Sequence, residues 1–175
     1  MNRNAFVNTS VKGRMAFVIC CAENTIAFYQ LNKGEWDFVL DILWGFMSLP
    51  KERDFALWHE NEGECVPWVI EGDVPYEKSD ITYLTKEHYY VLNKTYKNAP
   101  RVLNEIINHA FQIASFELYG SIVGNSPVTM KYIEEVINFM TQENIPMPDA
   151  ELFAKFSINE NNGWGRSFTR KDVFT

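Results

Sequence analysis

The sequence predicts an all-α fold, a single-domain bundle of about six or seven helices that spans residues 1–175. Apolar residues recur at spacings of three and four along most of the chain, which is the period of a helix with one buried face. Ser, Thr and Pro stand at the expected starts of several of these segments. No segment alternates cleanly between polar and apolar residues, although short strands stay open at residues 66–69 and 81–84.

The first predicted helix covers residues 11–32 and lies at the centre of the bundle. Ser10 is the candidate for its N-cap. Apolar residues surround this segment on nearly every side, which indicates burial rather than a surface position. Its main stripe is Met15, Ile19, Ala22, Ile26 and Tyr29.

The next two predicted helices are shorter. One covers residues 35–47 and carries Glu35 and Asp37 in its first turn, where the helix dipole favours anions. Pro50 stands at the first position of the other, which runs through Trp58.

The second buried helix is predicted for residues 100–123, where a proline opens a segment with two apolar stripes. Thr85 caps a helix before it, and Ser126 caps another after it. The tail from residue 157 is rich in Asn and Gly and reads as a loop. Trp164 and Phe168 nevertheless predict that this tail docks onto the bundle.

The composition predicts a globular, cytoplasmic protein with no membrane span. The chain is 46% hydrophobic, which is too apolar for disorder, and charged residues interrupt every long apolar run. Cys20, Cys21 and Cys65 make an odd count without a disulfide framework, which favours reduced thiols in a cytoplasm. Basic residues precede the apolar run 15–22 as in a signal peptide. Glu23 follows that run at once, however, and the helical pattern continues beyond it.

Acidic residues concentrate in one part of the chain. Between Glu35 and Asp80, twelve acidic residues stand against three basic ones, so this part carries a charge of -9 and the remainder sums to +2. Residues 61–79 contain four Gly and Pro residues and no sustained period, which predicts a long acidic loop. Such a surface repels nucleic acid and anionic membranes, and it attracts basic partners.

The acidic stretch also contains Trp and Tyr, the residue types in which protein interfaces concentrate their affinity. We therefore predict that it binds a partner protein. The alternative is that Trp58 and Trp68 pin the loop to the helices while the carboxylates keep the protein soluble, and both roles can coexist. The candidate partner-binding residues are Trp58, Glu60, Glu62, Glu64, Trp68, Glu71, Asp73, Tyr76, Glu77 and Asp80.

A metal site in this stretch is disfavoured. Its possible ligands lack the i, i+4 histidine pair of a helical zinc site, and only one histidine is near. These possible ligands are His59, Glu60, Glu62, Glu64 and Cys65. We expect no metal and no other cofactor.

Common catalytic motifs are absent too: the chain has no G-x-S-x-G, P-loop, G-x-G-x-x-G or H-E-x-x-H string. Cys20 and Cys21 lie among apolar residues, which favours a core role over that of a nucleophile. The sequence thus favours a binding protein over an enzyme. The alternative is an enzyme or small-ligand-binding protein with a pocket between the two buried helices, formed by Glu23, His109 and Glu117. A third interpretation is an oligomeric helical scaffold.

Two short motifs carry a resemblance to a known family. Cys21-Ala22-Glu23 precedes Tyr29 in the first helix, and Leu40-Asp41 precedes Trp44 in the second. This first quarter of the chain resembles the all-helical immunity proteins of bacterial polymorphic toxin systems, specifically immunity protein family six. The resemblance implies a cytoplasmic antidote that binds and blocks a cognate toxin domain without catalytic chemistry. The acidic stretch agrees with a basic toxin such as a nuclease.

Overall fold

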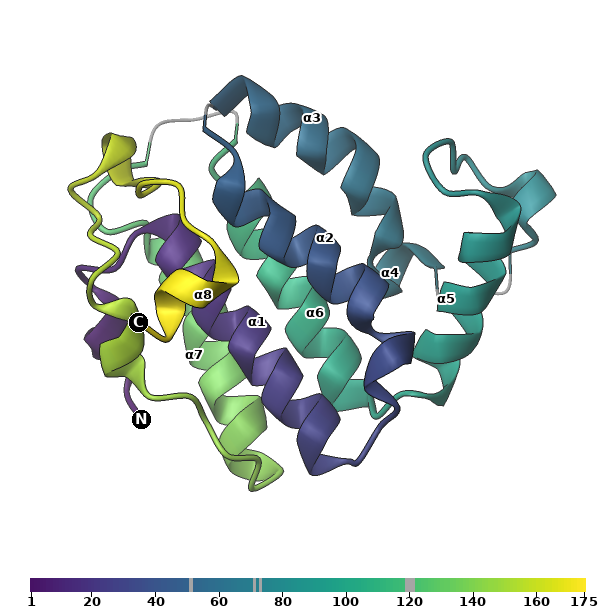
Figure 1. Ribbon diagram of the computed structural model, residues 1–175, viewed down its shortest axis with the longest axis horizontal. Coiled ribbons are helices and arrows are strands. Elements are labelled where there is room, and N and C mark those ends of the chain that lie inside the picture. The colour runs from purple at the N-terminus through teal and green to yellow at the C-terminus, as the bar shows by residue number, and fades with distance from the viewer. Residues whose placement is uncertain (51, 71, 73, 119–121) are drawn as a thin grey trace.

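The computed structural model spans residues 1–175, and the structure describes all of them except 51, 71, 73 and 119–121 (Figure 1). The described residues form eight α-helices, six short 3-10 helices and no strand. Their one β-type contact is an isolated bridge between Thr9 and Ser157. The prediction of an all-α fold is therefore confirmed, and residues 66–69 and 81–84 form no strand.

The α-helices are α1 (Val11–Phe28), α2 (Asp37–Ser48), α3 (Glu52–Glu62), α4 (Pro67–Ile70), α5 (Lys86–Asn98), α6 (Arg101–Ser115), α7 (Pro127–Gln142) and α8 (Arg170–Val173). The 3-10 helices are η1 (Arg3–Phe6), η2 (Lys33–Glu35), η3 (Gly63–Cys65), η4 (Tyr76–Lys78), η5 (Ala150–Phe153) and η6 (Asn161–Gly163).

Helices α1 and α6 form the centre of the bundle, as the sequence predicted. They pack against each other more extensively than any other pair of described elements, and α2 and α7 also pack on α1 (Figure 1). Both central helices are buried along most of their length. Helices α3, α4 and α5 cover the other side of α6 or pack on its neighbours.

Both central helices end earlier than predicted. Helix α1 stops at Phe28 because Gln30 adopts a left-handed conformation with φ of 53°, which breaks the helical path. Helix α6 stops at Ser115, and the chain then turns so that the Leu118 amide bonds to the Ser115 carbonyl. The predicted caps are confirmed at the N-terminal ends of α1, α5 and α7. There the hydroxyls of Ser10, Thr85 and Ser126 each accept a hydrogen bond from a backbone amide.

The first turn of α1 contains two fully buried cations that the sequence did not reveal as core residues. Lys12 Nζ donates to the Leu49 carbonyl at 2.6 Å and to the Met47 carbonyl at 3.2 Å. These carbonyls lie at the C-terminal end of α2, where the helix dipole favours a positive charge. The guanidinium of Arg14 donates to several carbonyls of the η1 and pre-α7 segments. The start of α1 therefore joins three parts of the fold.

Residues 61–79 are not the plain loop that we predicted. Helix α3 extends to Glu62, and η3, α4 and η4 follow in short succession. Pro67 begins α4, where its missing amide hydrogen costs no hydrogen bond. Cys65 and Ile70 are buried, so apolar packing holds these short helices in place. Such short helices leave no repeat of 3.6 residues by which the sequence could predict them.

The C-terminal tail docks onto the bundle, as predicted. Trp164 is buried with its ring 4.8 Å from that of Phe55, and the Phe168 amide donates to the Met47 carbonyl at 3.1 Å. Within the described part of the chain, no helix has both the length and the apolar character needed to cross a bilayer.

Candidate functional site

The end of α3 together with η3, α4 and η4 contributes to one face of the molecule, where α4 packs on η3, α5 and α6 (Figure 1). Two adjoining hollows of about 450 and 380 Å³ mark it, and both are lined by Glu64 and Val69. We call this face the α3–η4 surface and define it by Glu60, Glu64, Trp68, Val69, Val74 and Asp80.

Apolar side chains stand exposed on the α3–η4 surface. The exposed fractions are 43% for Trp68, 40% for Val69 and 50% for Val74. Exposed apolar and aromatic side chains that lie near one another are a feature of many protein interfaces, although exposed apolar residues also occur elsewhere on this chain.

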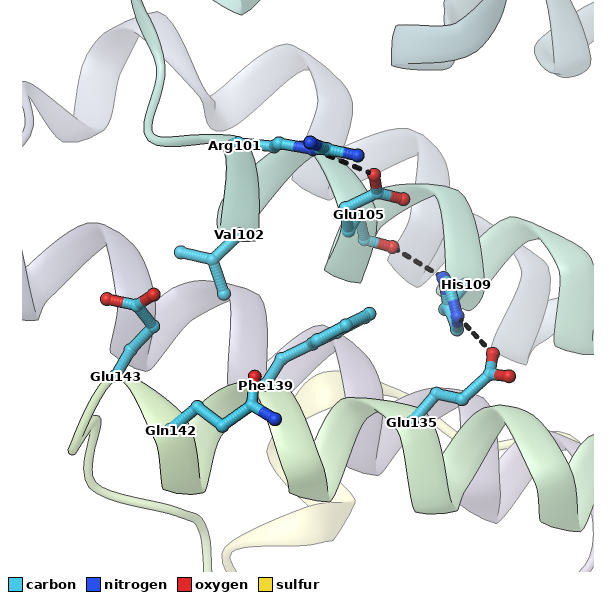
Figure 2. Close-up of a pocket in the computed structure, with 8 residues that line it drawn as sticks. All are labelled: Arg101, Val102, Glu105, His109, Glu135, Phe139, Gln142 and Glu143. Atoms are coloured by element: carbon cyan, nitrogen blue, oxygen red, sulfur yellow. Dashed lines mark hydrogen bonds and ion pairs between the residues drawn. The ribbon is translucent and has the colours of Figure 1, made fainter.

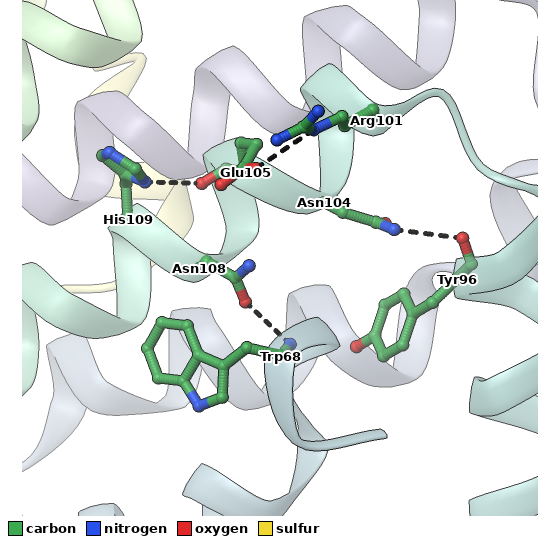
Figure 3. Close-up of polar contacts among 7 residues, drawn as sticks. All are labelled: Trp68, Tyr96, Arg101, Asn104, Glu105, Asn108 and His109. Carbon is green, nitrogen blue, oxygen red and sulfur yellow. Dashed lines mark hydrogen bonds and ion pairs between the residues drawn. The ribbon is translucent and has the colours of Figure 1, made fainter. Parts of the chain in front are cut away.

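The backbone of Trp68 is fastened to α6, while the residue stays partly exposed. Its backbone amide donates to Asn108 Oδ1 at 3.2 Å, which fastens α4 to α6, and Figure 3 shows its ring beside Asn108. In the same region Asn104 Nδ2 donates to the Tyr96 carbonyl at 3.0 Å, which joins α6 to α5. A fixed backbone at this position reduces the conformational entropy that the segment would lose on binding.

Glu64 anchors the segment that borders the α3–η4 surface. Its Oε1 accepts from Thr82 N and Oγ1 at 2.8 and 3.0 Å, and its Oε2 accepts from Tyr83 N and Leu84 N at 2.7 and 3.2 Å. The carboxylate thus replaces the partners that these backbone amides lack outside a helix. Glu64 shapes the surface more than it offers a free charge.

Glu62 is also turned toward the protein. Its Oε1 accepts from the Tyr83 hydroxyl at 3.0 Å, and its Oε2 is buried. Burial raises the pKa of Glu62, while burial and the bond to Glu62 raise the pKa of Tyr83 to about 12.

Among the described residues of this face, the free negative charge comes from Glu60 and Asp80, and Lys78 lines the same hollow as Asp80. Both acidic residues are exposed, and neither has a hydrogen-bond or ion-pair partner among the described residues. Glu77 differs, because Lys86 forms an ion pair with it and lowers the pKa of its carboxyl.

The remaining predicted partner-binding residues lie elsewhere or outside the described residues. Trp58 is buried and donates from Nε1 to the Ile42 carbonyl at 3.2 Å, so it joins α3 to α2. Tyr76 is half-buried and donates from its hydroxyl to the Leu84 carbonyl at 2.8 Å. Glu71 and Asp73 lie outside the described residues.

The other reactive side chains of the chain do not gather here. Among the described residues, no group of three His, Cys, Asp or Glu side chains is placed to hold a metal ion. Cys20, Cys21 and Cys65 are buried free thiols. Burial raises the pKa of Cys20 and of Cys65 to about 12, and it raises the pKa of Cys21 well above its ordinary value.

A separate cleft of about 430 Å³ lies between α6 and α7 (Figure 2). His109 Nε2 is 2.7 Å from Glu135 Oε2, and His109 Nδ1 is 2.8 Å from the Glu105 carbonyl. Both ring nitrogens therefore face acceptors. Sequence reasoning found His109 but missed Glu135, because the pair is 26 residues apart and on different helices.

Glu23, His109 and Glu117 do not converge in a pocket between the two central helices. The Glu23 carboxylate accepts from Trp44 Nε1 at 3.0 Å and from Arg170 at 2.9 Å. Glu117 Oε1 instead accepts from the Ser126 hydroxyl. Each of these three side chains therefore makes its polar contacts in a different part of the structure.

Neither a protein-family model, nor a curated protein, nor a solved structure matches this chain.

Proposed function

We propose that this chain is a cytoplasmic immunity protein of a bacterial polymorphic toxin system. It binds a cognate basic toxin domain through the α3–η4 surface and blocks that domain. The observation that carries the proposal is the exposed Trp68, whose backbone is fastened to α6, beside the exposed Val69 and the unpaired carboxylate of Glu60.

The charge of the face favours a basic partner. Glu60 and Asp80 form no ion pair within the described residues, and Lys78 is the one Lys or Arg among the described residues that line the two hollows. The sequence outside residues 35–80 is slightly positive. Carboxylates around an apolar centre accelerate encounter with a positive protein and repel nucleic acid. A nuclease toxin presents such a positive surface, because it must attract phosphates.

The proposal is tested by reconstitution. A basic domain captured from the native cytoplasm would be purified, expressed alone to determine whether it stops growth, and co-expressed with this chain to determine whether growth returns. We expect a stoichiometric complex and restored growth. A captured domain that is harmless alone, or harmful whether or not this chain is present, would contradict the proposal.

Charge reversal locates the interface. Glu60→Lys and Asp80→Lys change carboxylates that hold no part of the described structure together, and Glu151→Lys is the matched control on distant η5. We expect the first two to slow association about tenfold at low salt, with the difference shrinking at high salt, and the control to leave it unchanged. Equal rates for all three variants would move the interface away from this face.

Binding of a small ligand in the α6–α7 cleft is a second candidate function, favoured by the His109–Glu135 contact inside it. Because both ring nitrogens of His109 are engaged, a catalytic role as a base would require one of these bonds to open. His109→Gln distinguishes the two functions. It should leave toxin binding unchanged, whereas loss of toxin binding with a folded variant would place the interface at this cleft.

A further inference from the structure

We propose that the larger hollow of the α3–η4 surface, lined by His59, Glu60, Gly63, Glu64, Trp68, Val69 and Phe111, binds one arginine side chain of the partner. This inference rests on the proposed function and adds the chemical group that the surface recognises. Three features carry it: aromatic walls, a carboxylate rim without a cation, and a floor brought close by a glycine.

Aromatic rings form the walls and the floor of the hollow. Phe111 of α6 is buried at the floor, the His59 ring stacks on it at 5.2 Å, and the Trp68 ring meets it edge-on at 5.7 Å. Trp68 is 43% exposed and lines the hollow, so a ligand in the hollow can reach this residue. A guanidinium binds to an aromatic ring face more favourably than to water-exposed aliphatic carbon.

Gly63 sets the depth of the hollow. A Cβ atom at this position would lie 2.8 Å from Phe111 Cζ, closer than side chains tolerate. The glycine therefore lets η3 approach the Phe111 ring, and Glu60 near the end of α3 and Glu64 within η3 line the same hollow as that ring. A larger residue would have to push the ring and the rim apart.

The rim supplies negative charge alone. Glu60 has no hydrogen-bond or ion-pair partner among the described residues, and Glu64 is fixed by its bonds to residues 82–84. None of the described residues that line the hollow is Lys or Arg. Burial lowers the pKa of His59, so this ring is neutral at pH 7 and does not repel a cation.

Arginine fits this combination better than lysine. Its planar guanidinium stacks on an aromatic ring while its edge donates two parallel hydrogen bonds to a carboxylate. An ammonium group is more strongly hydrated and cannot stack in this way. The hollow of about 450 Å³ also leaves room for the aliphatic stem of arginine against Val69.

The test titrates the whole protein with Nα-acetyl-arginine amide and follows the NMR signals of the Trp68 indole and the Gly63 amide. Nα-acetyl-citrulline amide has nearly the same shape without the charge, and Nα-acetyl-lysine amide has the charge without the plane. We expect saturable shifts with the arginine probe, weaker ones with lysine and none with citrulline. Equal shifts with citrulline, or none with arginine at these two signals, would overturn the proposal.

Variants make the assignment specific. Glu60→Gln should weaken binding of the arginine probe about threefold, as loss of an exposed ion pair does, and Trp68→Leu by about the same factor through the lost ring face. Glu151→Gln on η5 is the matched control and should change nothing. If all three variants bind the probe equally while their NMR spectra show the native fold, the arginine site is refuted.

The two proposals fail in different ways. If the toxin domain binds and is blocked but the arginine probe does not shift Trp68, the arginine site is wrong and the proposed function stands. If the probe binds as described but the reconstituted domain is not blocked, the site stands without the proposed function.

Discussion

Replacing Glu64 tests whether one carboxylate fixes the border of the α3–η4 surface. Its two oxygens accept four hydrogen bonds, three of them from the backbone amides of residues 82, 83 and 84. In Glu64→Gln, one oxygen becomes an amide nitrogen, which cannot accept. Two of the four hydrogen bonds then lose their acceptor, whichever oxygen is replaced, and the remaining bonds lose the charge that strengthens them.

The magnitude follows from those two lost bonds. A hydrogen bond contributes about 1 kcal/mol net, and bonds to a charged group contribute about 1.5 to 3 kcal/mol. Glu64 is partly exposed, so water replaces some of what is lost, and we expect a total of about 2 kcal/mol. Glu62→Gln is the matched control two residues away, because its one described bond is to the Tyr83 hydroxyl and an amide can keep it.

The assay combines urea unfolding with hydrogen exchange. Urea unfolding reports the global free energy of unfolding, and exchange at the amides of residues 82 to 84 reports local opening. We expect these amides to exchange at least tenfold faster in Glu64→Gln than in Glu62→Gln, since 1.4 kcal/mol is a factor of ten. Unchanged exchange at these amides together with equal unfolding free energies would refute the anchoring role of Glu64.

Three further predictions concern the core. Gly165→Ala should destabilise the protein by about 2 to 4 kcal/mol in thermal unfolding, since Gly165 has φ of 87° and a Cβ would lie 2.2 Å from Ser10 Oγ, the N-cap of α1. Gly45→Ala, on an open face of α2, is the control and should stabilise by up to about 1 kcal/mol; equal losses would contradict the steric argument. Burial lowers the pKa of Lys12 from 10.5 to about 8. Between these two pH values the unfolded chain binds more protons than the folded protein, so Lys12 makes the free energy of unfolding rise with pH by at most about 3 kcal/mol. The unfolding free energy of wild type minus that of Lys12→Met should rise over that pH range. A difference independent of pH would refute the burial of a charged lysine. The buried thiols of Cys20, Cys21 and Cys65 should react with Ellman's reagent at pH 8 only as fast as the protein unfolds. Rapid reaction of any one of them would contradict its burial.

The sequence by itself determined the helical character of the chain and the identity of its two central helices. Periodicity suffices for this, because a helix that is apolar nearly all round can lie only inside a bundle. It also determined several helix starts, since Ser10, Thr85 and Ser126 act on amides within three residues of themselves. The acidic stretch was equally visible, because charge is a property of composition.

Only the tertiary structure decided which of those acidic residues keep a free charge. Glu60 and Glu64 are four residues apart and look alike in the sequence, yet one is free among the described residues and the other holds residues 82–84. Lys12 likewise reads as a surface residue, but the carbonyls that end α2 accept its hydrogen bonds in the core. In each instance the deciding partner is at least 18 residues away. Local sequence patterns do not predict partners so far apart in the chain, because it is the packing of the helices that brings them together.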